Sequence, residues 1–265
     1  MPAPDLTRPV RFSKWHALGN SYLLLESADL APAVDEELVR RLCDVRVGIG
    51  SDGLLEVLAV DGARADVAVW NPDGSKAEFS GNGSRIAAAW LARRAGAAAV
   101  TVSVSGRAYP ASLREDGGVA MAVGDVEVGE FESLLVEEER IELTTVSVGN
   151  PHAVVRTDGG RDALLRLGPR LERHARFPER TNVQLVRVTG PNELSVLVWE
   201  RGAGETSASG SSAVAAAAAA VTNGWCSSPV TVRMPGGELC VELDDDNRAT
   251  LVGPAEEICV GELRL

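Results

Sequence analysis

The chain has 265 residues, of which 45% are hydrophobic and 24% are charged. This balance is close to the norm for globular proteins, excludes a disordered polypeptide, and allows either one large domain or two of ordinary size. The formal net charge of −12 argues against nucleic acid or an anionic membrane as a partner, because both bind proteins through an excess of Lys and Arg.

Neither the start of the chain nor its apolar runs predict membrane attachment. The longest apolar run, residues 213–221, is far shorter than the roughly 20 residues that a membrane-spanning helix needs. The opening residues, MPAPDLTRPVRF, lack the charged start and apolar middle of a signal peptide, so a cytoplasmic protein is expected. The cysteines show no metal-ligand spacing, and we expect small apolar fillers. They are Cys43, Cys226, Cys240 and Cys259.

The hydrophobic pattern predicts strands and helices in sequence through the first half of the chain. A strand over 22–26 precedes a helix over 35–43, in which apolar residues recur at spacings of three and four. Alternating strands follow over 54–60 and 65–70. A Ser-Gly-Asn-Gly turn then leads into an apolar helix over 81–94. Strands joined by Gly and Asp turns complete this part of the chain.

Four segments of the first half recur in the second half at nearly one offset. LGNSYLLLE, starting at Leu18, matches VGNPHAVVR, which starts 130 residues later. DVAVWNPDGSKAEFSG, starting at Asp66, matches SVLVWERGAGETSASG, which starts 129 residues later. VTVSVSG and AVG likewise match VTVRMPG and LVG. We conclude that the chain contains two copies of one unit.

The duplication predicts an α/β (α+β) fold of two pseudo-symmetric halves, in each of which strands wrap a central helix. The second central helix, over 210–222, is apolar on every side and is expected to be buried. We place the first half at residues 1–124, completed by a returning segment at 254–265, and the second half at 125–253. Two similar halves commonly form a site where they face each other, and the repeated glycine turn is its expected occupant.

The start of each central helix is a candidate anion site. A helix start offers unpaired backbone N–H groups and the positive end of the helix dipole. Glycine at this point lets a ligand approach the backbone closely. We therefore expect Gly81 and Asn82 in one half, and Gly210 and Ser211 in the other, to hold one carboxylate between them.

A serine precedes each glycine turn, Ser80 in the first half and Ser209 in the second. Serine is among the best N-cap residues, so either serine taken alone is expected to satisfy its own helix and nothing else. Because the two serines occur as a matched pair in a duplicated turn, a functional role is expected as much as two separate capping roles. In the functional interpretation, the two side chains flank the atom to which the bound carboxylate is attached.

Weaker signals lie elsewhere in the sequence. GIGSDG matches a dinucleotide-binding pattern, but the strand-like LLEVLAV follows it where that site requires a helix, so we expect a false match. His16 and His174 belong to no motif, whereas His152 lies in GNPH, the repeat counterpart of GNSY. Glu200 and Arg201 follow a strand directly before a glycine turn, a position that suits substrate contact as well as surface ion pairing.

Together these segments resemble the diaminopimelate epimerase family of cofactor-independent amino-acid epimerases. The matching pieces run in family order from end to end. They are HALGNSYLLLE, LCDVRVGIGSDGLLEV, NPDGSKAEFSGNGSR, VGNPHAVV, HARFPERTNVQLV, WERGAGETSASGSS, VTVRMPGGEL and LVGPAEE. The resemblance implies two pseudo-symmetric α/β halves, each a mixed sheet around a central helix, with an amino acid held in the cleft between them. It also implies a homodimer that needs neither cofactor nor metal.

The resemblance further implies roles for individual residues. The positions that match those around the distal amino-acid end of diaminopimelate are Asn20, Asn71, Asn150, Asn182 and Arg201. The positions that match those around the reacting carboxylate are Gly81, Asn82, Gly210 and Ser211. Glu200 and His152 match positions near the reacting amine.

The chain departs from the family pattern at both reacting positions. Where the family has a cysteine before each glycine turn, acting as acid or base on opposite faces of the substrate Cα, this chain has Ser80 and Ser209. A helix start lowers the pKa of a thiol from about 8.5 toward neutral, whereas a hydroxyl stays protonated unless a base activates it. We therefore expect ordinary two-thiol epimerisation to be crippled.

Three interpretations follow. The favoured one is an isomerase acting without cofactor at the α-carbon of diaminopimelate or a similar amino acid, with a serine as proton donor and Glu200 or His152 as base. Its runner-up is a lyase, dehydratase or cyclase on the same class of substrate. The second interpretation is an epimerase whose two cysteines were changed to serine, and the third is a non-catalytic amino-acid-binding paralogue. GNS for the family's GND, and GSS for its GTG or GSG, favour natural divergence.

Overall fold

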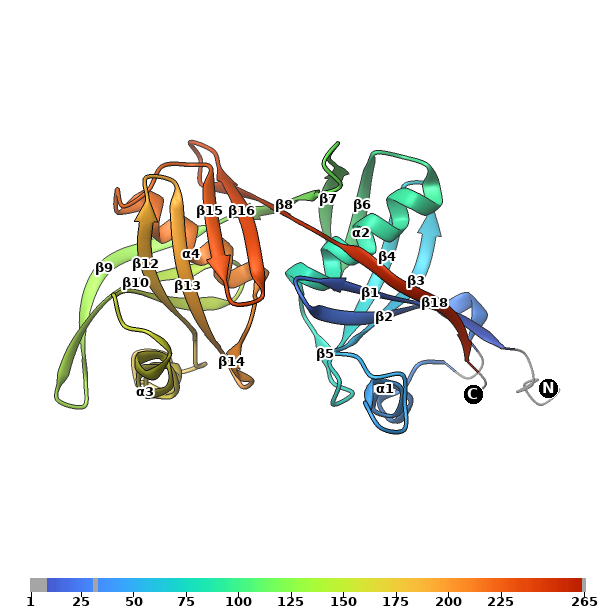
Figure 1. Ribbon diagram of the computed structural model, residues 1–265, viewed down its shortest axis with the longest axis horizontal. Coiled ribbons are helices and arrows are strands. Elements are labelled where there is room, and N and C mark those ends of the chain that lie inside the picture. The colour runs from blue at the N-terminus through green and yellow to red at the C-terminus, as the bar shows by residue number, and fades with distance from the viewer. Residues whose placement is uncertain (1–8, 31–32, 264–265) are drawn as a thin grey trace. The chain divides into compact units, whose positions relative to one another are not determined.

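The repeat in the sequence is also a repeat in the topology. The computed structural model describes residues 9–30 and 33–263, and the chain divides into two compact units (Figure 1). One unit contains the described residues up to Met121 and from Gly253 onward, and the other contains Ala122–Val252. The boundary thus falls slightly before the Gly124 expected from the sequence, and the last segment of the chain belongs to the first unit.

The first unit is a mixed sheet with two α-helices and a short 3-10 helix, η1. Its elements are β1 (Val10–Ala17), β2 (Asn20–Glu26), η1 (Ser27–Asp29), α1 (Glu36–Cys43), β3 (Leu54–Asp61), β4 (Arg64–Trp70), β5 (Lys76–Ala77), α2 (Gly81–Ala95), β6 (Ala99–Val104), β7 (Arg107–Leu113), β8 (Val119–Asp125), which crosses the boundary, and β18 (Glu256–Leu263). Neighbouring strands follow the order β18-β1-β2-β3-β4-β6-β7-β8, and β5 also pairs with β4. The pairs β2–β3 and β4–β6 are parallel, and the others are antiparallel.

The second unit repeats this plan. Its elements are β9 (Glu127–Val136), β10 (Glu139–Ser147), β11 (Pro151–Arg156), α3 (Arg161–Glu172), β12 (Asn182–Gly190), β13 (Glu193–Glu200), β14 (Gly204–Thr206), α4 (Gly210–Thr222), β15 (Val230–Met234), β16 (Gly237–Leu243) and β17 (Arg248–Gly253). The order is β9-β10-β11-β12-β13-β15-β16-β17, with β14 on β13 and with β11–β12 and β13–β15 parallel. In the first sheet, β18 therefore takes the place that β9 takes in the second.

Side-chain alternation along the strands places one helix on each face of each sheet. In β2, Leu23 packs in a cluster with residues of α1, so its neighbour Tyr22 faces the other side, where α2 packs. In β11, Ala153 packs in a cluster with residues of α3, so its neighbour His152 faces α4. The residues that face α2 and α4 are thus in a position to reach the glycine turns.

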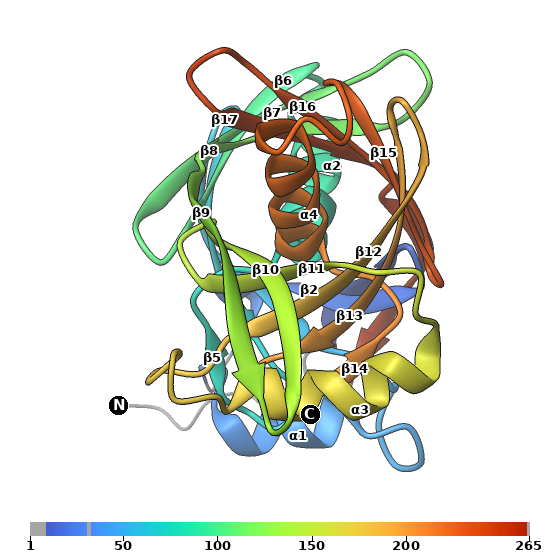
Figure 2. The same cartoon turned by 90° about the vertical axis from the view of Figure 1, so that its left-hand side faces the viewer.

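The central helices confirm the predicted fold class. Helix α2 starts directly after Ser80 and ends at Ala95, and the φ of 61° at its C-cap, Gly96, is the left-handed conformation that favours glycine. Helix α4 is buried over residues 212–220, and Figure 2 shows it enclosed by strands of its own unit. Alanine makes up most of this stretch, and its small side chain lets strands approach the helix closely.

The structure also bears on the expectations for the cysteines and for the GIGSDG segment. Cys43 and Cys226 are buried as expected, but Cys259 is exposed on the edge strand β18, so the filler interpretation is wrong for that residue. Strand β3 follows the GIGSDG segment, which agrees with a false dinucleotide match.

Among the described residues, no helix has both the length and the apolar character required to cross a membrane, and no group of potential metal ligands is present.

Candidate functional site

Each glycine turn is surrounded by polar side chains from its own unit, which form two half-sites. The first half-site consists of Asn20, Tyr22, Ser80, Gly81, Asn82 and Arg85. The second half-site consists of Asn150, His152, Asn182, Gln184, Glu200, Arg201, Ser209, Gly210, Ser211 and Ser212.

In the first half-site, Ser80 acts as the N-cap of α2. Its backbone is extended and its Oγ accepts a hydrogen bond of 3.0 Å from the N–H of Gly83, which is the ordinary capping geometry. The same Oγ lies 3.0 Å from the hydroxyl of Tyr22 on β2. Ser80 therefore caps its helix and also shares a hydrogen bond with a titratable side chain.

A buried arginine orients the amides of the first half-site. Arg85 is fully buried, and its guanidinium donates to Asn82 Oδ1 at 2.8 Å and to the carbonyl of Gly81 at 3.2 Å. Asn82 Nδ2 in turn donates to Asn20 Oδ1 at 3.2 Å. Burial lowers the pKa of Arg85 to about 10, so the side chain stays charged at neutral pH. It adds a positive charge at the start of α2, where the helix dipole is already positive.

Asn71, the remaining predicted binding residue of the first unit, holds a turn. Its Nδ2 donates to Ser75 Oγ at 2.9 Å, and its backbone N–H donates to the carbonyl of Ser75 at 2.8 Å. These bonds close the loop between β4 and β5. No hydrogen bond between described residues links Asn71 to the first half-site.

In the second half-site, Ser209 differs from Ser80. It occupies the N-cap position of α4 with extended backbone, yet its side chain makes no capping hydrogen bond within the described part of the chain. Its hydroxyl instead acts on the carboxylate of Glu200, at the end of β13. Burial raises the pKa of Glu200, and the hydroxyl of Ser209 partly opposes that rise by stabilising the carboxylate.

His152 is neutral and engaged at both ring nitrogens. Its Nε2 lies 2.9 Å from Asn150 Oδ1, and its Nδ1 lies 3.0 Å from Gln184 Nε2. An amide nitrogen only donates, so Nδ1 accepts and Nε2 carries the proton that is donated to Asn150. Complete burial lowers the pKa of His152 to about 3. The geometry therefore suits orientation of Asn150 better than removal of a proton near neutral pH.

Asn182 and a buried glutamate hold the turn that follows β13. Asn182 Oδ1 accepts from the backbone N–H of Arg201 at 2.9 Å, and its Nδ2 donates to the carbonyl of Pro151 at 3.0 Å. Glu172, from α3, accepts from the N–H of Gly202 at 3.0 Å and from Trp199 Nε1 at 2.8 Å. The position of Glu200 is thus fixed on both sides, while Arg201 remains exposed.

Both helix starts keep the donors that anion binding requires. The N–H groups of Gly81 and Asn82 precede the first intrahelical hydrogen bond of α2, which joins Ser84 N–H to the carbonyl of Ser80. Gly210 and Ser211 hold the same place in α4, whose first bond runs from Ala213 to Ser209. Each unit therefore presents backbone donors beside its serine.

Four residues of the half-sites were missed by sequence analysis, namely Tyr22, Arg85, Gln184 and Ser212, which directly follows the predicted Ser211. Tyr22 is the repeat counterpart of His152, since GNSY aligns with GNPH, and this pairing was the available signal. Gln184 follows Asn182 at the two-residue spacing of one strand face. Arg85 gave no signal, because an arginine in the first turns of a helix usually extends into solvent.

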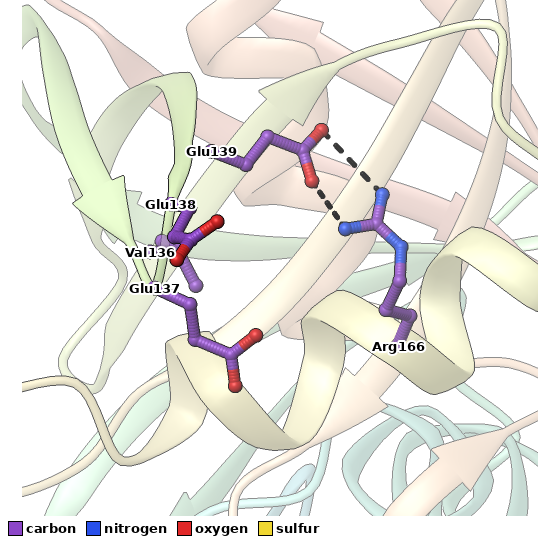
Figure 3. Close-up of a pocket in the computed structure, with 5 residues that line it drawn as sticks. All are labelled: Val136, Glu137, Glu138, Glu139 and Arg166. Carbon is purple, nitrogen blue, oxygen red and sulfur yellow. Dashed lines mark hydrogen bonds and ion pairs between the residues drawn. The ribbon is translucent and has the colours of Figure 1, made fainter.

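The second unit also has a pocket of about 480 Å³ that none of the predicted site residues lines. It lies at the turn between β9 and β10 and is bordered by Glu137, Glu138, Glu139 and Arg166 of α3. Arg166 is paired with Glu139 (Figure 3). Surface ion pairs of this kind stabilise a protein little, and the pocket offers no nucleophile or buried acid. The half-sites remain the candidate site.

Comparison with known proteins finds matches over nearly the whole chain. The family model described as diaminopimelate epimerase matches residues 12–129 and 144–258. Diaminopimelate epimerase from Desulfitobacterium hafniense is 37% identical, covering 94% of this chain and 96% of that protein. The enzyme of the same name from Pseudomonas syringae pv. tomato is 35% identical, covering 97% and 99%. A solved structure of a predicted epimerase from Pseudomonas aeruginosa superposes with a TM-score of 0.71 at 18% identity, over 96% of this chain and 99% of that one, which shows a shared fold.

Proposed function

Because the chain belongs to the diaminopimelate epimerase family, whose members are amino-acid epimerases and racemases that work without pyridoxal phosphate, we propose that it is an isomerase acting at the α-carbon of diaminopimelate or of an amino acid of similar form. The observation that carries the proposal is the placement of Ser209 at the start of α4, without a capping bond in the described part of the chain, where its hydroxyl acts on the buried carboxylate of Glu200. A hydroxyl at a helix start needs a base before it can take a proton, and Glu200 supplies one.

The proposed reaction begins with the α-carboxylate of the substrate at the two helix starts. The N–H groups of Gly81, Asn82, Gly210 and Ser211 bind it, and the two positive helix ends stabilise the negative charge that develops as the Cα–H bond breaks. Ser209 takes the α-proton and passes its own proton to Glu200. The raised pKa of Glu200 makes that carboxylate a stronger base than an ordinary glutamate.

The remaining predicted residues would hold the rest of the substrate. We assign the distal amino-acid end to Asn20, Asn71, Asn150, Asn182 and Arg201. Asn150 is oriented by neutral His152, and Asn20 is oriented by Asn82 and Arg85. The amides of Asn71 and Asn182 already make intramolecular hydrogen bonds, so their contribution to substrate binding rests on the donors and lone pairs that these bonds leave.

The experiment that tests the proposal is incubation with LL- and meso-diaminopimelate in heavy water. We expect deuterium at one α-carbon together with inverted configuration, read by mass spectrometry and chiral chromatography. A new product mass would assign elimination or cyclisation instead, and binding without either change would assign an amino-acid-binding protein. Ser209→Ala, which leaves the helix start in place, should abolish the deuterium incorporation into the isomer whose α-hydrogen faces Ser209, without abolishing binding.

A further inference from the structure

The two serines differ in their capping bonds, which Ser80 makes and Ser209 does not, and this inference, which rests on the proposed function, follows from that difference. A hydroxyl has one proton to donate and two lone pairs that accept. Ser209 makes no capping bond within the described part of the chain, and its hydroxyl acts on the carboxylate of Glu200, which can receive its proton. Ser80 accepts from the N–H of Gly83, which already occupies one lone pair.

The hydroxyl of Tyr22 is placed to occupy the second lone pair of Ser80. The two oxygens are 3.0 Å apart, and a phenol with an ordinary pKa of about 10 is protonated at neutral pH. Either hydroxyl of this pair can donate; in the arrangement in which Tyr22 donates, as the N–H of Gly83 does, the proton of Ser80 is directed away from both. Ser80 is then arranged as an acid, whereas Ser209 is arranged as a base.

Packing within the first unit fixes the position of the Tyr22 ring. Tyr22 is 7% exposed and faces α2 from the start of β2. A Cβ added to Gly53 would lie 2.6 Å from Tyr22 Cε1, so the ring rests directly against the backbone of that glycine. Any larger residue at position 53 would displace the ring. The hydroxyl is therefore held at Ser80 by packing as well as by its hydrogen bond.

We propose that Tyr22 is a positioning residue that sets Ser80 as the proton donor for one face of the substrate α-carbon and resupplies its proton. When the Cα–H bond breaks, its electron pair stays on carbon and its proton goes to Ser209, whose own proton goes to Glu200. The Ser80 O–H bond then breaks as a new Cα–H bond forms on the opposite face, and the phenolic proton moves to Ser80 Oγ. Water later reprotonates Tyr22 and takes the proton from Glu200.

The test measures exchange of the substrate α-hydrogen for deuterium, separately for each face of the α-carbon. The LL and meso isomers of diaminopimelate present the reacting α-hydrogen on opposite faces, so each isomer reports on one serine. For Tyr22→Phe, which keeps the ring against Gly53, we expect the exchange of the isomer that faces Ser80 to fall about a hundredfold. The isomer that faces Ser209 should still exchange at the wild-type rate, now with retained configuration. KM for both isomers should be unchanged.

Two further variants keep the result interpretable. Ser80→Ala should give the same one-sided loss as Tyr22→Phe, and Tyr109→Phe should change neither exchange rate, because that second tyrosine stacks on Phe79 in the same unit. An equal slowing of both isomers by Tyr22→Phe, or full exchange in Ser80→Ala, overturns the role of Tyr22 and leaves the proposed function standing. If the unmodified protein exchanges neither isomer, the proposed function itself fails, and the role of Tyr22 fails with it.

Discussion

The two half-sites start from the same turn and differ in what their serines contact. Ser80 caps α2 and lies beside the phenol of Tyr22. Ser209 makes no capping bond in the described part of the chain, and its hydroxyl acts on the carboxylate of Glu200. A phenol is a weak acid that stays protonated at neutral pH, and a carboxylate is a base. One duplicated backbone therefore supports a donor in one copy and an acceptor in the other.

The repeat shows where this difference arose. Tyr22 and His152 hold equivalent positions, and so do Asn71 and Glu200. In the first unit the titratable group is Tyr22 on β2, and Asn71 lies in a turn. In the second unit it is Glu200 at the end of β13, and His152 is neutral. Helix starts and sheet order are common to both units, so the chemistry of each half-site depends on a few side chains.

Replacing both serines with cysteine is the strongest way to erase the difference. A thiol has a pKa near 8.5, and a helix start lowers it further. The deprotonated thiolate is therefore available near neutral pH, whereas a serine hydroxyl stays protonated. Each pKa unit of better matching is worth about 1.4 kcal/mol, or tenfold in rate. For Ser80→Cys with Ser209→Cys we expect the initial rate of LL-to-meso conversion, followed by chiral chromatography, to rise at least about a hundredfold.

The single variants show whether the half-sites are unequal. Because removal of the α-proton is the difficult step, Ser209→Cys alone should give more of the gain than Ser80→Cys alone. Ser112→Cys, on exposed β7 surface, adds a thiol away from both turns and should give none. Equal gains from the two single variants would contradict the assignment of base and acid.

Much of the fold, but less of the site, could be predicted from the sequence. The duplicated segments and their periodicity gave two units with a buried central helix, because repeats and periodic burial are written along the chain. Hydrogen-bond partners depend instead on which side chains meet after packing. Arg85 sits in GNGSR like a surface cation, yet it folds back under the turn to Asn82. Tyr22 had a repeat signal, but only the folded ring position places its hydroxyl at Ser80.

Neutralising Glu200 should affect function and stability in opposite directions. Glu200→Gln removes the base that serves Ser209, and we expect kcat to fall by about two to four orders of magnitude. Because burial raises the folded-state pKa of Glu200, its charged form costs stability above the unfolded-state pKa. The variant should therefore melt at a higher temperature than the original at pH 7, and the two melting temperatures should converge as the pH falls to about 4.

Glu205→Gln provides the matched control for that prediction. Glu205 lies five positions further along, pairs with Arg161 at 2.7 Å on the surface, and has its pKa lowered by that arginine. Its loss should leave kcat unchanged and should not raise the melting temperature at any pH, since its charged form is favoured in the folded state. If neither variant melted at a higher temperature, burial of the charged Glu200 side chain would carry no cost in stability. An equal rise for both variants would show that the gain does not come from that burial.

The smallest expected effect concerns the native cysteines. Cys259 is exposed and should react first with N-ethylmaleimide, whereas burial raises the pKa of Cys43 to about 11 and keeps its thiolate scarce. Neither half-site contains a cysteine, so complete labelling of Cys259, followed by intact mass, should leave the isomerisation rate unchanged. The double Ser-to-Cys variant should instead lose its added activity as a second and third adduct form. Inactivation of the original chain in step with its first adduct would mean that proton transfer depends on a native thiol, and the contrast between the two serines would then not describe the reaction.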